Sequence, residues 1–456
     1  MRVLRIAARL LAFVSLALIA AQPALAQSVL RDTETEAFFH DMAAPLINAA
    51  GLDPENVRVV LLNDPQINAF VAGGQTVYVN SGLIEAADKA SEVQGVVAHE
   101  LGHIAGGHII RQGEGMKGPS NISILSLIAG LGAMLAGAGD AGMAAMMIGQ
   151  RAAVGQMLAY SRSEESSADA AGARYLSKAG ISGRGSLDFF KKLSNLESRY
   201  GVSRSPDAEF VQTHPLTSDR IATLRETYIR DPAWNKPDDP ELQARFIRIK
   251  GKLEGYLDDP KKTLRDYPPG DDSVAGHYAR AYAYHKEAET AKALDETRAL
   301  IAKSPDDPYF LELEGQILLE AGRPDQALGD LRKATELSRS APLIATLFGH
   351  ALIATEDPSH YAEAETVLRA AVARDNENPF AWRQLGFVYA ARGDMARANL
   401  ATAEQQVITG DYTLAVASAR KAEAGLPEGS RDRLRAQDVE MQARALYDEQ
   451  RQMRRK

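Results

Sequence analysis

The apolar residues of the first part of the chain follow helical spacing and then strand spacing. Glu34–Ala50 carries apolar residues three or four positions apart, as one face of a helix requires. Val57–Leu62 is a short β-branched run, and two further runs of strand type, Asn68–Val71 and Thr76–Asn80, flank Gly73-Gly74. The pattern therefore predicts a helix, a strand and a pair of strands joined at the glycines.

An apolar run that follows these strands is interrupted by H-E-x-x-H, formed by His99, Glu100 and His103. One helical turn separates the two histidines, so both imidazoles project from one face and can share a metal ion. Glu100 lies beside them and can activate the attacking water of a zinc peptidase. Ser91 and Gln94 have the spacing of a capping box, which predicts a helix start near Ser91. The alternative is an ordinary helix with two histidines and a chance glutamate.

A third ligand has to come from elsewhere in the chain. The spacing H-E-x-x-H-x-x-G-x-x-H would place it at position 109, which is Ile109, and the nearby His108 is out of register. His108 is therefore interpreted as a helix-end or packing histidine. Within the helical segment 160–172, Glu165 and Asp169 lie one turn apart and face the same way.

Glu165 fits the third ligand, and Asp169 fits an acceptor for a ligand imidazole. Glu164 is the rival ligand, and a solvated acidic helix start is the alternative for the whole segment.

His214 precedes a proline, so it belongs to a loop or a helix start rather than to a helix interior. It could contact substrate, or it could be a fourth metal ligand that displaces the water and silences an enzyme. A loop histidine that only caps a helix is the third possibility.

Two apolar stretches between the candidate ligands allow three interpretations. Ile122–Ala138 is uncharged and Ala141–Ile148 continues it, both interrupted by glycines. The region 122–148 is predicted to be a buried helix, a surface that touches a membrane or an apolar client, or a membrane span, for which its length is marginal.

The second half of the chain is helical and repetitive. The same residue types recur at near-constant offsets, at Pro308, Pro342 and Pro379, at Gly315, Gly349 and Gly386, and at Ala327, Ala364 and Ala398. A period of about 34 residues with the pattern W-x-x-L-G-x-x-Y at 382–389 is typical of tetratricopeptide repeats. We expect at least three repeats, and such repeats bind other chains rather than catalyse. An unspecialised helical bundle is the alternative.

These patterns predict an α+β zincin-like metalloprotease domain followed by an all-α tetratricopeptide-repeat solenoid. The expected boundaries are 27–230 for the protease, 231–270 for a linker and a connecting helix over Leu242–Leu264, and 271–456 for the repeats. Residues 1–26 are predicted to be a cleaved signal peptide, with a basic start, an apolar stretch and an A-x-A site at 24–26.

The composition limits the possible binding partners and the possible metal ligands. The chain of 456 residues has a net charge of −8, which argues against a general nucleic-acid binder. It contains no cysteine, so a metal must be held by histidine and carboxylate, as in catalytic rather than structural zinc sites. Export without disulfides is also implied.

Taken together, His99-Glu100-x-x-His103, Glu165-x-x-x-Asp169, His214-Pro215 and the repeats resemble the BepA-type periplasmic metalloproteases. These belong to the peptidase family that includes HtpX and the CAAX prenyl proteases. The resemblance implies one zinc ion per chain held by His99, His103 and Glu165, catalysis by Glu100 and support from Asp169. It also implies a periplasmic role in quality control of outer-membrane proteins, with the repeats docking the assembly machinery.

The leading hypothesis is thus an exported zinc endopeptidase that acts on unfolded or misassembled envelope proteins, with substrate lying along the strand near Val77. The alternative is a chaperone or assembly scaffold with a latent or structural zinc site. A membrane-embedded protease is the third possibility, and peripheral membrane contact through 122–148 is compatible with the first two.

Overall fold

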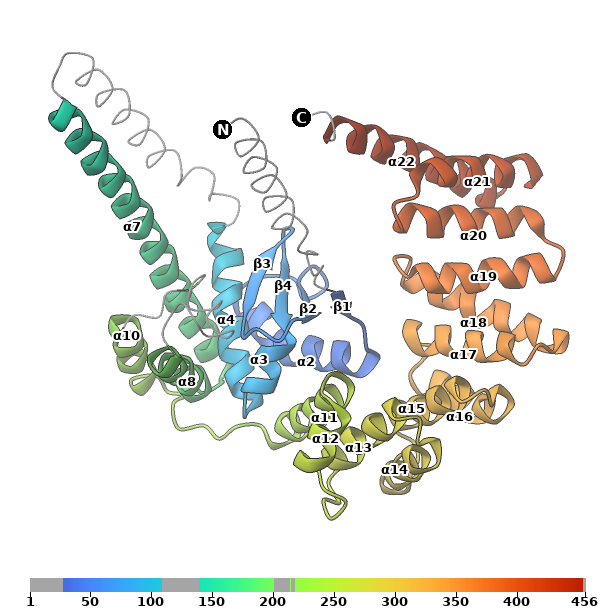
Figure 1. Cartoon of the computed structure of the whole chain (residues 1–456), viewed down its shortest axis with the longest axis horizontal. Helices are drawn as coiled ribbons and strands as arrows, with labels where there is room; N and C mark the ends of the chain where they lie inside the picture. Colours follow the sequence, from blue (N-terminus) through green and yellow to red (C-terminus); the bar gives the residue numbers. More distant parts are fainter. Residues whose placement is uncertain (1–27, 109–138, 201–213, 215–217, 454–456) are drawn as a thin grey trace, which may run out of the picture.

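The computed structural model describes residues 28–108, 139–200, 214 and 218–453. An N-terminal region contains one small sheet and the helices packed around it. A chain of paired helices then continues as an arc from that region to the C-terminus (Figure 1). The predicted signal peptide, 1–26, lies outside the described residues.

The sheet has four strands, in the order β1-β2-β4-β3. Their bounds are Ser28–Leu30 (β1), Arg58–Asn63 (β2), Ala69–Ala72 (β3) and Thr76–Asn80 (β4). Strands β2 and β4 are parallel, whereas β3 and β4 form the predicted antiparallel hairpin, with Gly73 and Gly74 at positive φ in its turn.

The sheet order corrects one expectation. Val77 belongs to β4, which has a neighbour on each side, so substrate cannot add along that strand. Within the described residues β3 pairs only with β4, and it is therefore the edge available beside the helix α4.

Six helices of the described residues pack around this sheet. They are Thr33–Ala49 (α2), Ser81–Ala86 (α3), Ala90–Gly106 (α4), Gly139–Ala179 (α7), Arg184–Tyr200 (α8) and Ser218–Ile229 (α10). Helix α4 lies at the centre, in contact with α2, α7 and α8, and every residue of it from Ala90 to His103 is buried. A helix surrounded in this way can place polar side chains out of water.

The start of α4 agrees with the prediction to within one residue, but the predicted capping box is wrong. Lys89 is the N-cap residue and makes no side-chain cap. The Ser91 hydroxyl has no hydrogen-bond partner among the described residues, and Gln94 donates to the Met42 carbonyl instead. Glu92 accepts from the Asp88 N–H at 3.1 Å, a local contact between residues four apart across the helix start.

Two glycines let α4 and α7 cross closely. A Cβ at Gly102 would lie 2.7 Å from the Ala168 carbonyl oxygen, and one at Gly172 would lie 3.0 Å from the Ala98 carbonyl oxygen. A Cβ does not fit at Gly102 unless the backbone of α7 moves, and one at Gly172 would need α4 to shift by a few tenths of an ångström. This contact sets Glu165 and Asp169 beside His99 and His103.

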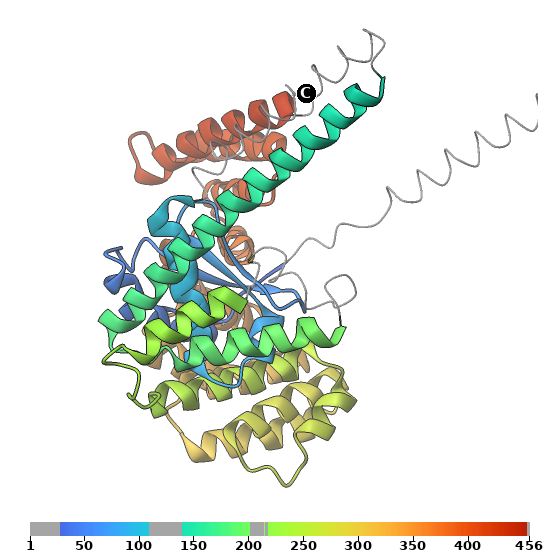
Figure 2. The same cartoon turned by 90° about the vertical axis from the view of Figure 1, so that its left-hand side faces the viewer.

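Helix α7 extends well beyond the rest of the N-terminal region (Figure 2). The second predicted apolar stretch, Ala141–Ile148, lies near the start of α7, whereas Ile122–Ala138 lies outside the described residues. None of the helices built from described residues is long and apolar enough to cross a membrane. The three interpretations of Ile122–Ala138 stay predictions.

The predicted single connecting helix over Leu242–Leu264 is wrong. Asp259 caps a new helix and Pro260 begins it, so the segment forms α11, Pro240–Leu257, and α12, Pro260–Asp266. Phe246, Ile249 and Leu253 of α11 belong to the apolar core of the N-terminal region.

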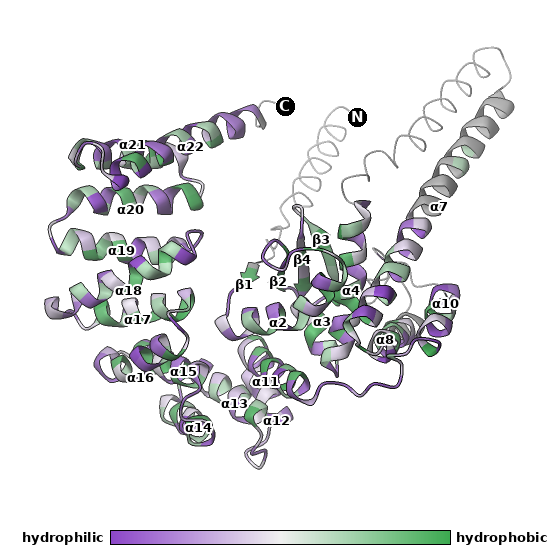
Figure 3. Ribbon diagram, turned by 180° about the vertical axis from the view of Figure 1, so that it is seen from behind, coloured by the Kyte–Doolittle hydropathy of each residue, from purple (hydrophilic) through white to green (hydrophobic). Residues whose placement is uncertain are grey.

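The remaining helices stack in sequence along the arc. They are Val274–Lys286 (α13), Thr290–Lys303 (α14), Pro308–Glu320 (α15), Pro324–Leu337 (α16), Pro342–Ala354 (α17), Tyr361–Arg374 (α18), Pro379–Ala391 (α19), Met395–Ile408 (α20), Tyr412–Gly425 (α21) and Arg431–Met453 (α22). Figure 3 shows hydrophobic and hydrophilic positions alternating along most of them, as expected where one face packs on the next helix.

The repeated small residues let these helices pair closely. The prolines open α15, α17 and α19, Gly315 faces Leu331, and Gly349 faces Leu368 at the pair contacts. The predicted fold class, a metalloprotease domain followed by an all-α repeat solenoid, is confirmed.

Candidate metal centre

Four side chains from three distant parts of the sequence converge in the N-terminal region. His99, His103, Glu165 and His214 are all buried, and each offers one ligand atom within 4.8 Å of the others. The Nε2 atoms of His99 and His103 are 3.2 Å apart, and Glu165 Oε1 lies 3.1 Å from His214 Nδ1. Among the described residues this is the one group of three or more potential ligands that can hold a metal ion.

Further side chains orient the two histidines of α4. Asp169 Oδ1 lies 2.9 Å from His99 Nδ1, as expected for the acceptor of a ligand imidazole. His108 Nδ1 lies 2.9 Å from His103 Nδ1, just beyond the left-handed Gly107 that ends α4. Both Nδ1 atoms of the α4 histidines are therefore engaged on the outside, which leaves both Nε2 atoms facing Glu165.

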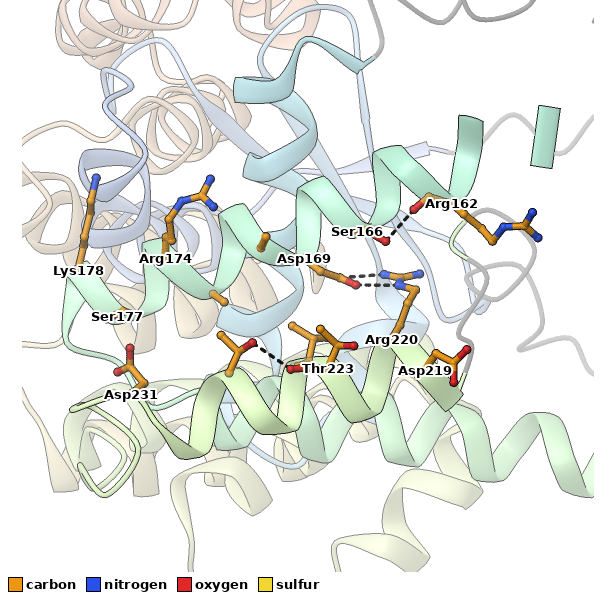
Figure 4. A pocket seen from close by; sticks show the side chains of 14 residues that line it. Arg162, Ser166, Asp169, Arg174, Ser177, Lys178, Asp219, Arg220, Thr223 and Asp231 are labelled. Carbon is orange, nitrogen blue, oxygen red and sulfur yellow. Dashed lines mark hydrogen bonds and ion pairs between the residues drawn. The ribbon is translucent and has the colours of Figure 1, made fainter. Parts of the chain in front are cut away.

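Arg220, in the first turn of α10, also belongs to this site, and sequence reasoning assigned it no role. Its Nε and Nη2 donate to Asp169 at 2.7 and 2.8 Å, and its Nη1 lies 3.0 Å from Glu165 Oε2. Figure 4 shows the paired contacts to Asp169 across the space between α7 and α10. The only signal in the sequence was its position shortly after His214.

The electrostatics of the cluster favour a cation. Burial lowers the pKa of His99, but hydrogen bonds to Asp169 and Glu165 outweigh it and raise that pKa to about 10. Burial raises the pKa of Glu165, and hydrogen bonds from His103, His214 and His99 lower it well below the usual range. For Asp169 burial likewise opposes Arg220 and His99, which together lower its pKa. Both carboxylates therefore stay ionised, and the negative charge that holds a proton on His99 can hold a metal ion instead.

The donor set fits a divalent transition metal. Two imidazole Nε2 atoms at 3.2 Å repel each other unless a proton or a metal lies between them, and three nitrogens with one carboxylate suit zinc. Glu100 Oε1 is buried 3.5 Å from His214 Nε2 and accepts no hydrogen bond from the described residues. A buried carboxylate oxygen without a donor beside a metal site is suited to accept a proton from water.

A cavity of about 600 Å³ lies behind this cluster, between α7 and α10. Asp169, Arg220 and Thr223 form part of its wall (Figure 4), and Ala173 and Leu224 also line it. The two side chains that brace the proposed ligands are thus reachable from the outside of the protein.

A buried H-E-x-x-H helix crossed by a second helix that carries a carboxylate is the arrangement of a metallopeptidase. The chain belongs to peptidase family M48. The family model, described as Peptidase family M48, matches residues 11–228. A protease HtpX homolog from Gemmatimonas aurantiaca is 30% identical over 219 residues, covering 41% of this chain and 74% of that protein.

Relatives that extend over most of the chain are named beta-barrel assembly-enhancing protease. The protein from Yersinia pestis is 26% identical over 389 residues, covering 82% of this chain and 76% of its own length. The protein from Escherichia coli is 26% identical over 403 residues, covering 86% and 80%. The solved structure of YrrB, described as a tetratricopeptide-repeat protein, matches 40% of this chain and 94% of its own at 19% identity and a TM-score of 0.32. The assignment of the arc as a repeat solenoid follows from its own helix pairs.

Proposed function

We propose that the protein is an exported zinc-dependent endopeptidase, with one zinc ion per chain held by His99, His103 and Glu165. The observation that carries the proposal is the convergence of these buried donors, with His214, within 4.8 Å. The sequence distances between them mean that only the folded chain forms the site, as a catalytic centre requires.

The residues around the metal then each have a defined task in peptide-bond hydrolysis. A bound zinc ion supplies Lewis-acid activation of water and of the scissile carbonyl. Glu100 takes a proton from the attacking water through Oε1, which accepts no hydrogen bond from the described residues, and passes it to the leaving amine. Asp169 holds His99 with its Nε2 facing the site.

Strand β3, an edge strand of the sheet among the described residues, is the proposed place for substrate. It lies at the end of the sheet order and contacts α4, so a polypeptide added to it in extended form would run beside the metal helix. Main-chain hydrogen bonds would hold such a substrate largely independently of its sequence. This binding mode suits unfolded polypeptides.

The alternative function is a chaperone or assembly scaffold whose zinc site is latent or structural. One observation favours it: His214 Nδ1 lies 3.1 Å from Glu165 Oε1 and its Nε2 lies 3.5 Å from Glu100 Oε1. A histidine in that place can complete a closed four-ligand site and displace the water. The two functions can also coexist in an enzyme that His214 switches off.

The names of the relatives support a setting in the cell envelope. Proteins called beta-barrel assembly-enhancing protease match most of the chain, including its repeats. We therefore propose unfolded or misassembled envelope proteins as substrates, a periplasmic location, and repeats that dock clients or the outer-membrane assembly machinery. Peripheral membrane contact through 122–148 is part of this proposal, and no nucleic acid is involved.

Cleavage of an unfolded β-rich test protein, with zinc present, tests the proposal. The chain from Gln27 onward is compared with its Glu100→Gln and His214→Ala variants, and zinc content is measured for all three. Glu100→Gln is expected to retain zinc and lose cleavage at least about 100-fold, the usual scale for a general base.

The three patterns of result point to different conclusions. Cleavage that disappears in Glu100→Gln supports the endopeptidase. Cleavage seen only in His214→Ala supports an enzyme held closed by that histidine. Zinc bound with no cleavage in any of the three supports the scaffold.

A further inference from the structure

We infer that Arg220 is a positioning residue of the metal centre, which holds Glu165 and Asp169 in the geometry that zinc binding requires. The inference rests on the proposed function, because it takes Glu165 to be a zinc ligand. It assigns the third helix of the site, α10, a role in metal binding although α10 itself offers no ligand.

The contacts of Arg220 use the shape of the guanidinium group and not only its charge. Nε and Nη2 form a fork on the two oxygens of Asp169, at 2.7 and 2.8 Å, while Nη1 reaches Glu165 Oε2 at 3.0 Å. Arg220 is only 8% exposed, so these bonds are largely shielded from water. A lysine ammonium is a single point and cannot span both carboxylates in this way.

Two of the three proposed ligands depend on these contacts. Glu165 is held directly through Oε2, and His99 is held through Asp169, whose Oδ1 lies 2.9 Å from His99 Nδ1. Without the guanidinium, both carboxylates would face a buried space with fewer donors and would turn toward the cavity or bind protons. The ligand side chains would then have to be reordered each time zinc binds, which weakens binding.

Charge alone predicts the opposite result, which makes the inference testable. Glu100, Glu165 and Asp169 are opposed by the single charge of Arg220, so with neutral imidazoles the cluster carries two negative charges, the number one zinc ion balances. Removing Arg220 would leave three negative charges and, by attraction alone, tighter zinc binding. Our inference is that loss of position outweighs that gain.

The cavity behind the cluster provides a chemical test of position. Arg220 and Asp169 line a space of about 600 Å³ that opens to the surface between α7 and α10. When the side chain is shortened to alanine, a free guanidinium ion is small enough to enter this space and bridge the two carboxylates again. An effect of Arg220 that came only from the packing of α10 would not be restored by such an ion.

The experiment measures the zinc dissociation constant by competition with a chromophoric chelator. Arg220→Ala and Arg220→Lys are compared with the unchanged chain, with and without guanidinium chloride at low millimolar, non-denaturing concentration. Arg225→Ala is the matched control, because Arg225 lies on the same helix and is exposed.

We expect zinc binding about 10- to 100-fold weaker in Arg220→Ala, the usual cost of losing a residue that orients metal ligands. Arg220→Lys should fall between that variant and the unchanged chain, and guanidinium should recover affinity in Arg220→Ala only. Unchanged or tighter zinc binding in Arg220→Ala would overturn the inference, and so would full affinity in Arg220→Lys.

A Glu165→Ala variant, measured in parallel, separates this inference from the proposed function. If Glu165→Ala binds zinc as tightly as the unchanged chain, the ligand set itself is wrong. If Glu165→Ala loses zinc while Arg220→Ala does not, the ligand set stands and only the positioning role is rejected. If Arg220→Ala does not fold, Arg220→Lys still shows whether zinc affinity depends on the positive charge alone or on the shape of the guanidinium group.

Discussion

Two buried clusters of polar side chains have a similar arrangement. In both, carboxylates accept hydrogen bonds from nitrogen donors on other helices. The first is the metal centre around Glu165. The second, here the junction cluster, surrounds Glu34 of α2 and joins α2, α11, α13 and α15. Its members are Asp32, Glu34, Arg248, Lys252, Tyr278 and Asp307.

In the junction cluster two of the donors to Glu34, Arg248 and Lys252, are cations, and the third is the neutral Tyr278 hydroxyl. Lys252 Nζ lies 3.3 Å from Glu34 Oε2, the Tyr278 hydroxyl donates to the same oxygen at 2.8 Å, and Arg248 pairs with both Glu34 and Asp307. Burial lowers the pKa of Lys252, but Asp32 opposes it and the pKa ends well above its ordinary value. Arg248 and Lys252 therefore stay protonated and offer no lone pair to a metal ion.

The metal centre differs in having imidazoles where the junction cluster has lysine and tyrosine. A metal ion can displace the proton of an imidazole and bind the lone pair that the proton leaves, whereas a guanidinium stays protonated and the ion-paired ammonium of Lys252 holds its proton well above the ordinary pKa. The same buried carboxylate therefore makes a metal site in one place and a structural ion pair in the other. The junction cluster holds the first two repeat pairs against the protease core.

The largest effect that separates the clusters is expected from Glu34→Ala. It leaves Arg248 and Lys252 buried without their shared partner, which typically costs about 3–5 kcal/mol. Urea unfolding followed by circular dichroism measures the loss, and zinc affinity should not change. Glu36→Ala, on the same helix but in an exposed ion pair with Arg31, should cost at most about 1 kcal/mol. Weaker zinc binding in Glu34→Ala would mean that the clusters are energetically coupled.

Removal of the metal should lower stability through the metal centre alone and leave the junction cluster unchanged. Zinc at about 100 times its dissociation constant stabilises a folded protein by about 2.7 kcal/mol, so a chelator should lower the unfolding midpoint of the unchanged chain. The same shift is expected in Glu34→Ala, whose metal centre is intact. Glu165→Ala should show no shift, and a chelator effect of full size in that variant would point to a second metal site.

A smaller effect concerns Glu312 of α15, which lies near the junction cluster. Burial raises its pKa, Lys252 lowers it, Asp32 and Glu34 raise it, and the result is about 8. The folded chain then holds a proton on Glu312 that the unfolded chain loses above about pH 4.5, so stability falls as pH rises from about 4.5 to 8.

Glu312→Gln removes this dependence and should be more stable than the unchanged chain at pH 8 by about 1–3 kcal/mol, with little difference at pH 4.5. Urea unfolding at both pH values measures it, and Glu428→Gln, at a side chain that is 92% exposed, is the control. Equal differences at the two pH values would show that Glu312 is ionised in the folded chain.

Sequence spacing was sufficient wherever the determining contacts are local. The turn between His99 and His103, the turn between Glu165 and Asp169, the glycines of the β3–β4 hairpin and the repeat period each specify structure within a few residues. For that reason the fold class, the candidate donors and the repeats could be predicted before any coordinates.

Only the tertiary structure decided what depends on distant partners. It placed β4 inside the sheet, brought Arg220 onto Asp169 and Glu165, and formed the junction cluster from four helices. A buried charge is stable only beside its partner, and where the partner is far away in sequence no local pattern marks the pair. Such long-range pairing decides which buried carboxylate can hold a metal and which one holds two parts of the protein together.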